Sequence, residues 1–485
     1  IYGMGYGEET DYHFKALSLG FEAKVAIDTY VFHKSEVSFG ISKEKKEKLE
    51  KNREIFFSRW GKEYDEAIKK YSENDPIEYI KSNLSESDLQ INCDSLFYLT
   101  DIVQNAGGCH VIVDLVNYMS ILGYNSNILY NNMNDYKEIM LFNPIDIKQI
   151  NSVKTNKIIS TIWASTFTAK KIAKQKNIPL ISFVQGYENY FENSNIYGCV
   201  ELTYKMSDSV LTISSYLKNK LKNIFDKDST VITNSINCDL IKHINNNKSV
   251  KTITVVLRGS VMKGDFLLMD LIKMISKKYN DIKINVVYMN EYIEFPNFEN
   301  NNVNKVLGPV ARTKVIELLQ TSDLYIDASL NEGFGLTALE AMAAGAVPVV
   351  SNSFGVLEYM ENGKNGFVID EVNNVEKYME KIELLINDDN TFNNLKKGCL
   401  MTINNFDFDN QIEKYIEYFN KDHKIVTENI EYSHKENELL NYFERSNIQT
   451  QKMRKSVYIM KKIIPKKLKN KIKNNIKRLY NMSNN

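Results

Sequence analysis

The sequence predicts an α/β protein built on two doubly wound parallel sheets that face each other across a cleft. First, short β-branched runs alternate with amphipathic helices from residue 94 onward, which is typical of parallel sheets covered by helices. Second, a polar Asn/Lys stretch at residues 241–250 divides this alternation into two sets. Third, a chain of 485 residues with 43% apolar residues is long enough to bury more than one core.

The first set of elements begins with a strand at residues 94–100, the glycine turn Gly107-Gly108 and a helix at residues 110–122. Further β-branched runs bounded by turn residues predict more strands, with helices between them. These strands lie near Asn127, Ile158, Leu180, Val210 and Val231. We expect residues 94–240 to form one domain.

The second set follows the polar stretch and has the same alternation of strand and helix. It comprises strands at residues 253–258, 284–289, 303–307 and 324–328 and helices at residues 266–278 and 313–319. An amphipathic helix at residues 409–419 is expected to close this unit. We therefore expect a second domain at residues 241–421.

The segment from Asn331 to Val350 directly follows the last of these strands and reads N-E-G-F-G-L-T-A-L-E-A-M-A-A-G-A-V-P-V-V. Ligands of open α/β sheets bind at the carboxyl ends of strands, so chemistry is expected here. A glycine turn opens a helix, and an anion such as a diphosphate would suit its free N–H groups. The residues that supply these groups are Gly333, Phe334, Gly335 and Leu336.

Two carboxylates stand eight residues apart around this turn. Glu332 lies in the loop, and Glu340 lies one turn along the helix, where its two oxygens could accept both hydroxyls of a ribose. The pattern predicts a site for a nucleotide-linked sugar. The alternative is an ordinary helix start, where acidic residues are favoured by the helix dipole.

A pair of cations is predicted on a neighbouring loop. Arg258 ends an apolar strand, and Lys263 follows five residues later, before Gly264. In a glycosyl transfer, negative charge builds on the departing diphosphate, and fixed cations stabilise that charge. No metal is then required. Solvated surface charges are the alternative for either residue alone.

These residues resemble the retaining glycosyltransferases of the GT-B fold, family 4, over residues 95–421. The resemblance rests on the glycine turn, the runs at residues 207–217 and 231–237, the cation pair, the paired glutamates, and Gly355 with Glu358. It implies two Rossmann-like domains facing a cleft, an acceptor domain followed by a donor domain.

The resemblance also implies roles for individual residues. Arg258 and Lys263 would hold the donor diphosphate, Glu340 the ribose, and Glu332 the hydroxyls of the transferred sugar. The glycines Gly107 and Gly108 would let the other domain approach the donor.

The acceptor side departs from the family pattern. Relatives often place His or Asp after the strand that ends at Val184, whereas this chain has Gln185 and Gly186, then Tyr187 and Glu188. The run V-Q-G-Y-E-N-Y-F resembles the V-Q-D-Y-E of rhamnosyltransferase-like members. We expect Gln185, Tyr187 and Glu188 on the acceptor side.

The expected activity is transfer of a sugar, with retention, from a nucleotide-sugar to a glycan or lipid-linked acceptor in cell-surface polysaccharide synthesis. Front-face attack within an ion pair needs no separate base, because the leaving oxygen takes the acceptor's proton. No cofactor is expected for this module. A phosphorylase or epimerase of the same fold, and a non-catalytic glycan-binding or scaffolding module, are the alternatives.

Residues 1–75 are similar to the closing segment of family 2 glycosyltransferases of the GT-A type. The resemblance makes Glu9 the base and His33 a metal ligand, but the Asp-x-Asp that such a site needs is absent from this stretch. A divalent metal is therefore expected only with an intact GT-A domain before Ile1. We expect a linker at residues 76–93 and a longer parent protein with two transferase modules.

The segment from Lys452 to Asn485 contains many Lys and Arg residues and no Asp or Glu. Its apolar residues recur at helical spacing, so the helical extension at residues 422–485 is predicted to end in a basic amphipathic helix. Such a helix suits an anionic membrane surface. A solvated or docked helix is the alternative, and RNA binding is disfavoured because no aromatic platform accompanies the charge.

Composition limits the remaining classes of function. The formal net charge is zero, and no apolar run approaches the roughly 18 residues of a membrane-spanning helix. The five cysteines are scattered without zinc spacing, which indicates a reducing compartment. We expect a cytoplasmic protein, peripheral on the inner face of the plasma membrane if the tail binds there, with no nucleic-acid partner.

Overall fold

The computed structural model describes residues 8–22, 43–73, 90–103, 106–133, 136, 138–191, 197–238, 241, 247–289, 301–308, 310–426 and 438. The chain divides into two compact units, Ile1–Ile91 and Asn92–Asn485. The predictions for the side chain of Glu9, for His33 and for the tail from Lys452 to Asn485 lie outside the described residues. Most of the expected linker at residues 76–93 and part of the polar stretch at residues 241–250 also lie outside the described residues.

The first unit contains the helices α1 (Glu8–Ser18) and α2 (Lys43–Glu73), which contact each other. Aromatic rings form their interface, because Phe14 packs edge-on against Phe56 with ring centroids 5.6 Å apart. Trp60 donates a hydrogen bond from Nε1 to Asp11 Oδ1 at 2.6 Å. The described helices thus share a small core of their own.

The second unit begins with a seven-stranded parallel sheet. Its spatial order is β4 (Ile145–Asp146), β3 (Ser126–Met133), β2 (Ser95–Ile102), β6 (Ile158–Ser160), β7 (Leu180–Val184), β8 (Ser209–Thr212) and β9 (Thr230–Val231). The helices that accompany it are α4 (Gly107–Ile121), α5 (Trp163–Lys176), α6 (Tyr197–Met206) and α7 (Ser215–Phe225). Outside this sheet, β1 (Ile91–Cys93) pairs with β5 (Val153–Thr155).

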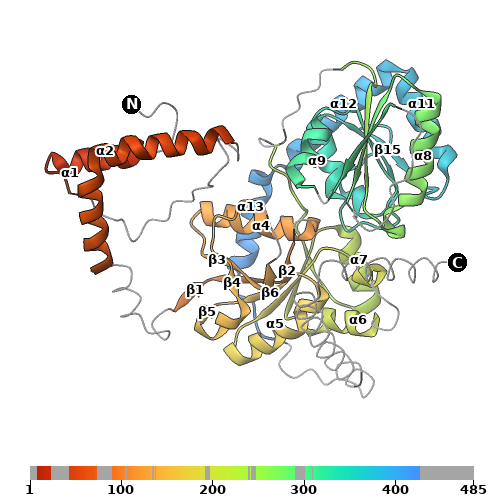
Figure 1. The fold of residues 1–485 in the computed structure, drawn as a ribbon. Coiled ribbons are helices and arrows are strands. Elements are labelled where there is room, and N and C mark those ends of the chain that lie inside the picture. The colour runs from red at the N-terminus through yellow and green to blue at the C-terminus, as the bar shows by residue number, and fades with distance from the viewer. Residues whose placement is uncertain are drawn as a thin grey trace, which may run out of the picture. The chain divides into compact units, whose positions relative to one another are not determined.

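A six-stranded parallel sheet follows in the same unit (Figure 1). Its spatial order is β12 (Val303–Leu307), β11 (Lys283–Tyr288), β10 (Thr252–Leu257), β13 (Leu324–Asp327), β14 (Val347–Ser351) and β15 (Phe367–Ile369). Its helices are α8 (Asp265–Lys278), α9 (Arg312–Gln320), α10 (Leu336–Ala344), α11 (Val375–Asn387) and α12 (Asp389–Ile403). The predicted fold class, two doubly wound Rossmann-like sheets, is confirmed.

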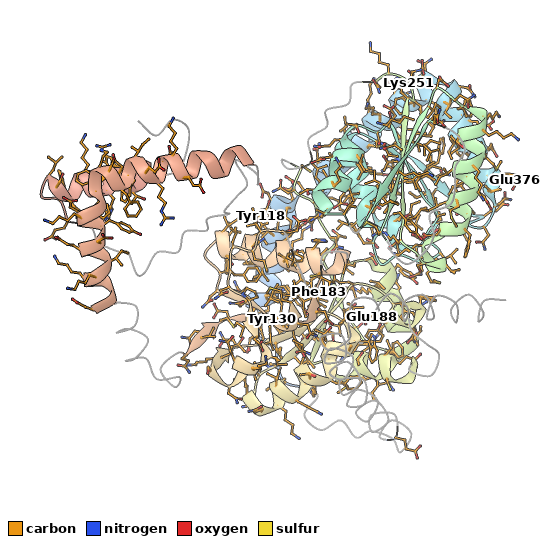
Figure 2. All side chains as sticks on the ribbon, in the orientation of Figure 1. Tyr118, Tyr130, Phe183, Glu188, Lys251 and Glu376 are labelled. Atoms are coloured by element: carbon orange, nitrogen blue, oxygen red, sulfur yellow. The ribbon has the colours of Figure 1, made fainter. Side chains whose placement is uncertain are left out.

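The central strands of both sheets are buried along most of their length, as expected where helices cover both faces of a parallel sheet. All five residues of β7 and five of the six residues of β10 are buried. Figure 2 shows side chains filling the interior of each sheet domain, with Phe183 of β7 inside the first. Among the described helices, none is both long and apolar enough to cross a bilayer.

One helix packs differently from the sequence-based expectation. The helix at residues 409–419 was expected to close the domain of the six-stranded sheet, but α13 (Phe408–Asn420) packs on the seven-stranded sheet. Tyr415 donates a hydrogen bond to the Ile232 carbonyl at 3.3 Å, and the rings of Phe419 and Phe97 lie 5.1 Å apart. The amphipathic pattern predicted the helix correctly, but it does not specify which sheet the apolar face covers.

Candidate donor-binding site

The order of the six-stranded sheet determines where its loops meet. The chain runs outward from β10 to β12 and then returns to β13 on the other side of β10. In such sheets the crevice at this reversal, beyond the carboxyl ends of the strands, binds ligands. Arg258 follows β10 directly and Asp327 ends β13, so the two predicted functional loops flank this crevice.

The loop after β10 is held in shape by Asp265, the first residue of α8. Its carboxylate accepts hydrogen bonds from the backbone N–H groups of Arg258, Gly259 and Ser260 at 3.2, 2.5 and 3.3 Å. Burial raises the pKa of Asp265, although these three hydrogen bonds favour its charged form. The sequence-based analysis did not identify this role.

Gly264 brings the end of this loop against β13. Its φ is +69°, and a Cβ atom there would lie 2.1 Å from the Ala328 carbonyl oxygen, so no other residue fits without movement. The Leu330 N–H donates to the Met262 carbonyl at 2.8 Å across the same contact. This close approach places Lys263 beside the loop that carries Glu332.

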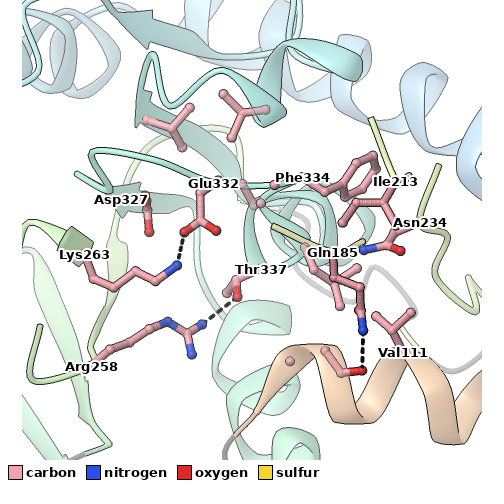
Figure 3. A pocket seen from close by; sticks show the side chains of 18 of the residues that line it. Val111, Gln185, Ile213, Asn234, Arg258, Lys263, Asp327, Glu332, Phe334 and Thr337 are labelled. Atoms are coloured by element: carbon pink, nitrogen blue, oxygen red, sulfur yellow. Dashed lines mark hydrogen bonds and ion pairs between the residues drawn. The ribbon is translucent and has the colours of Figure 1, made fainter. Parts of the chain in front are cut away.

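The predicted cations and the first glutamate meet at this point (Figure 3). Lys263 Nζ lies 2.6 Å from Glu332 Oε1, and the two side chains are only 20% and 19% exposed. Arg258 donates a hydrogen bond to Thr337 Oγ1 at 2.9 Å. Burial disfavours the charged form of Glu332, but Lys263 and Arg258 together hold its pKa below the ordinary value.

A second carboxyl group, Asp327, lines the same cavity and was not predicted. It accepts hydrogen bonds from the Ser329 N–H at 2.9 Å and from the Tyr325 hydroxyl at 3.3 Å. Burial raises its pKa, and the nearby charge of Glu332 raises it further. The site therefore holds two carboxyl groups whose environments shift their pKa values in opposite directions.

The glycine turn before α10 is formed as predicted by the spacing. Gly335 has a φ of +85° and is the residue before the first turn, with its carbonyl accepting a 2.6 Å hydrogen bond from the Tyr359 hydroxyl. The ring of Phe334 is buried and packs against Tyr359. Phe334 can thus offer a ligand its backbone but not its ring.

Both sheet domains contribute to the cavity, which has a volume of about 300 Å³. The predicted residues among those that line it are Gly107, Gly108, Gln185, Arg258, Lys263, Glu332, Gly333, Phe334, Gly335 and Leu336. Asn234, Asp327 and Thr337 also line it and were not predicted.

The wall formed by the first sheet domain includes the glycine pair and Gln185. Gly107 and Gly108 lie within the first turn of α4, which begins three residues earlier than expected. Gln185 donates a hydrogen bond to the Gly108 carbonyl at 3.2 Å, and a Cβ atom on Gly333 would lie 2.0 Å from the Gln185 carbonyl oxygen. The glycines therefore permit close approach of the two domains.

The other two residues expected on the acceptor side do not line this cavity. Tyr187 is buried, with its hydroxyl accepting a hydrogen bond from Asn189 at 3.1 Å. Glu188 accepts a hydrogen bond from the Trp163 N–H at 2.9 Å at the start of α5. Its position is explained by stabilisation of a helix N-terminus.

Glu340 lies on α10 behind the cavity and does not line it. Its Oε1 accepts a hydrogen bond from Arg312 Nε at 2.7 Å, and Arg312 also reaches Asp114 Oδ2 on α4 at 2.5 Å. Arg312 thereby connects the predicted ribose ligand with the opposite sheet domain. Because Asp114 and Arg312 are 198 positions apart, the sequence offered no signal for this bridge.

Residues 239–398 match the family model described as Glycosyl transferases group 1. The match covers the six-stranded sheet and the part of the candidate site that this sheet domain contributes, including Arg258, Lys263 and Glu332. Over these residues the chain therefore resembles the glycosyl transferases of group 1.

Curated relatives are similar over part of the chain. A Campylobacter jejuni N,N'-diacetylbacillosaminyl-diphospho-undecaprenol alpha-1,3-N-acetylgalactosaminyltransferase is 32% identical over 124 residues, which is 26% of this chain and 32% of the relative. An uncharacterized glycosyltransferase of Methanocaldococcus jannaschii is 28% identical over 222 residues, covering 44% of this chain and 60% of the relative. The chain thus matches less than two thirds of the length of either.

A third curated relative is the Escherichia coli UDP-Gal:alpha-D-GlcNAc-diphosphoundecaprenol alpha-1,3-galactosyltransferase. It is 31% identical over 104 residues, which cover 21% of this chain and 26% of the relative.

Solved structures share the fold at low sequence identity. Sucrose-phosphate synthase from Thermosynechococcus elongatus has a TM-score of 0.54 at 13% identity, covering 67% of this chain and 98% of that structure. The lipopolysaccharide glycosyltransferase WaaG has a TM-score of 0.53 at 12% identity, covering 68% and 100%. Anabaena HepE in complex with UDP-glucose has a TM-score of 0.52 at 15% identity, covering 67% and 99%.

Proposed function

We propose that the chain is a retaining, family 4-like glycosyltransferase that moves a hexose-type sugar from a nucleotide-sugar to a glycan or lipid-linked acceptor. The observation that carries this proposal is the cluster of Lys263, Arg258 and Glu332 at the strand reversal of the six-stranded sheet. Two cations and a carboxylate in one cavity match the needs of a diphosphate joined to a polyhydroxyl ring.

The cations would act on the leaving group. A diphosphate that enters the cavity meets Lys263 and Arg258, and the residues at the start of α10 line the same space, where their N–H groups would suit an anion. Charge that develops on the departing oxygen is stabilised by groups already in place. Each such group contributes on the order of 3 kcal/mol to lowering the barrier. In this proposal the chain's own cations supply the charge, and transfer needs no added metal.

Glu332 would hold hydroxyls of the transferred sugar. Its carboxylate also lies 2.6 Å from the Lys263 ammonium group and keeps that group at the cavity. The bond between the anomeric carbon and the phosphate oxygen breaks as the acceptor oxygen attacks from the same face. Attack from this face retains the configuration at the anomeric carbon. The acceptor's proton passes to the departing phosphate oxygen, so no separate base is needed.

The proposed acceptor class follows the relatives' names. The Campylobacter and Escherichia coli relatives are both named for diphospho-undecaprenol acceptors. A lipid-linked acceptor lies at a membrane, where the basic segment from Lys452 to Asn485 would favour an anionic surface. We therefore place the activity in cell-surface polysaccharide synthesis, on the cytoplasmic face of the membrane.

The test is turnover of a panel of UDP-, GDP- and dTDP-sugars with a membrane extract as acceptor source, in EDTA. We expect one nucleotide to be released, and Lys263→Ala to lower its rate by about 100-fold or more. Lys273→Ala is the matched control, because this exposed lysine of α8 pairs with Asp270 on the same helix and does not line the cavity. Turnover near the wild-type rate in folded Lys263→Ala would contradict the proposal.

A further inference from the structure

Exposed aromatic rings from both sheet domains lie side by side next to the donor site. Tyr216 of α7 stacks on Phe354, which follows β14, with ring centroids 4.9 Å apart and planes at 13°. Phe354 is 47% exposed, and the nearby Tyr190 is 37% exposed. We call Tyr190, Tyr216 and Phe354 the aromatic platform.

The backbone of Phe354 is in a conformation that residues with side chains rarely adopt. Its φ is 66° and its ψ is −61°, and the Gly355 N–H donates to the Ser353 carbonyl at 2.9 Å, which defines a strained γ-turn. Burial does not explain a phenylalanine here, because the ring is exposed. Strain of this kind concentrates at functional sites.

The strained turn is fastened to the loop that carries Glu332. The Glu332 N–H donates to the Ser353 carbonyl at 3.0 Å, and the Gly355 N–H reaches the Glu332 carbonyl at 3.2 Å. Asn331 also connects the two, since its side-chain amide donates to the Tyr216 hydroxyl at 2.9 Å. The platform is therefore hydrogen-bonded to the separate loop that carries Glu332, the proposed ligand of the donor sugar.

A lysine lies among the tyrosines of the platform. Lys220 Nζ lies 4.6 Å from the ring centroid of Tyr187, 4.8 Å from that of Tyr190 and 5.6 Å from that of Tyr216. It donates a hydrogen bond to the Tyr190 hydroxyl at 2.6 Å and has a second hydrogen-bonding partner in Tyr216, whereas an ammonium group has three N–H donors. Its described neighbours are aromatic rather than acidic, so its charge is available to an anion.

This combination fits one class of ligand. Aromatic faces carry partial negative charge, and the C–H groups along one face of a pyranose ring carry partial positive charge, so the two stack. An ammonium group next to the rings suits a phosphate attached to that sugar. We propose that the aromatic platform and Lys220 bind the acceptor as a saccharide phosphate, with the sugar ring on the platform and the phosphate at Lys220. This inference rests on the proposed function and specifies the acceptor.

A purely structural role is the competing explanation. The stack joins the two sheet domains, as does Glu358, which accepts hydrogen bonds from the Ser215 N–H at 2.5 Å and from the Ser215 hydroxyl at 3.3 Å. A domain clamp would affect stability or UDP binding when it is weakened. An acceptor site would affect the saccharide phosphate and leave both of those unchanged.

The test measures binding of N-acetylglucosamine 1-phosphate to the whole chain by calorimetry, with saturating UDP to fill the donor site. N-acetylglucosamine and inorganic phosphate are separate arms. The variants are Lys220→Ala and Phe354→Gly. Their controls are Lys218→Ala, an exposed lysine of the same helix, and Leu357→Ala, an exposed residue of the same turn.

We expect Lys220→Ala to weaken the sugar phosphate by about tenfold or more and to leave the neutral sugar unchanged. Phe354→Gly should weaken both saccharides, while its thermal unfolding midpoint stays the same or rises because glycine relieves the strained φ. Both controls should bind as wild type. UDP binding should be unchanged in every variant.

Three results would overturn the inference while leaving the proposed function intact. The first is that the wild-type protein binds UDP but no sugar phosphate. The second is that Lys220→Ala binds the sugar phosphate as tightly as the wild-type protein does. The third is that inorganic phosphate binds as tightly as the sugar phosphate. Loss of UDP binding in Phe354→Gly would show a clamp instead. Wild type that binds no nucleotide would overturn the proposed function itself.

Discussion

Replacing Arg312 with methionine should destabilise the protein through the charge it leaves behind. Arg312 holds Glu340 at 2.7 Å and Asp114 at 2.5 Å, and the Glu340 side chain is only 5% exposed. Burial disfavours the protonated guanidinium group, but these two carboxylates raise its pKa above the ordinary value. Methionine keeps much of the length of the side chain and removes the charge.

Removing one partner of a buried ion pair lowers the free energy of unfolding by about 3–5 kcal/mol, because the other charge stays buried without compensation. Since the Arg312 side chain is itself 20% exposed, water can reach part of the bridge, and we expect the lower end of this range. Arg312→Met should therefore lower the free energy of unfolding by about 3 kcal/mol in urea titrations followed by circular dichroism.

The double variant separates charge from packing. In Arg312→Met/Glu340→Gln no charge remains buried at this point, so more than half of the lost stability should return. Asp114→Asn should cost less than about 1 kcal/mol, because the Asp114 side chain is 39% exposed. The reasoning is refuted if Arg312→Met lies within about 0.5 kcal/mol of wild type, the range of ordinary surface changes.

Three further predictions concern the cavity and the glutamate behind it. Burial raises the pKa of Asp327 above 3.8, so this carboxyl group binds more protons in the folded state than in the unfolded state. The folded state therefore loses stability as pH rises. Asp327→Asn should raise the thermal unfolding midpoint at pH 7, and this gain should vanish as pH falls below 3.8. Gly333→Ala places a Cβ atom 2.0 Å from the Gln185 carbonyl oxygen, so steady-state assays should show transfer reduced by about 100-fold with UDP affinity retained. Glu340→Gln should reduce the preference for UDP over 2′,3′-dideoxy-UDP in calorimetry, and an unchanged preference would argue against a ribose contact.

Local patterns were sufficient for much of the fold. The strand predicted at residues 303–307 is present as β12. It could be predicted because its β-branched residues are bounded by Asn-rich and glycine turns. The start of α4 was misplaced by three residues, since Gly107 and Gly108 were interpreted as a turn before the helix. Glycine disfavours helix interiors but is tolerated in the first turn, so residue type alone could not locate this boundary.

The candidate site was predictable where it depends on loops that leave neighbouring strands. Arg258, Lys263 and Glu332 meet because parallel strands end at one edge of the sheet, which the alternation of strands and helices already implies. Asp327 ends β13 and could have been found by the same rule. The bridge from Arg312 could not, because it depends on how two domains dock.

The acceptor side was the least predictable part. Glu188 was assigned there by resemblance and accepts a hydrogen bond from the Trp163 N–H at the start of α5, so its role on the acceptor side stays a prediction. Phe354 gave no sign in the sequence, since a positive φ in a residue with a side chain is imposed by the loop that holds it. Properties of this kind arise from tertiary contacts rather than from local sequence.

The central claim is that Arg258 and Lys263 bind the diphosphate of a nucleotide donor. Calorimetry in EDTA with UDP, GDP and dTDP, and with the matching nucleosides, tests it most directly. We predict that wild type binds one diphosphate and that Lys263→Ala and Arg258→Ala each weaken it by about 10- to 100-fold, with the nucleoside unaffected. Equal diphosphate affinity in wild type and both variants would contradict the claim.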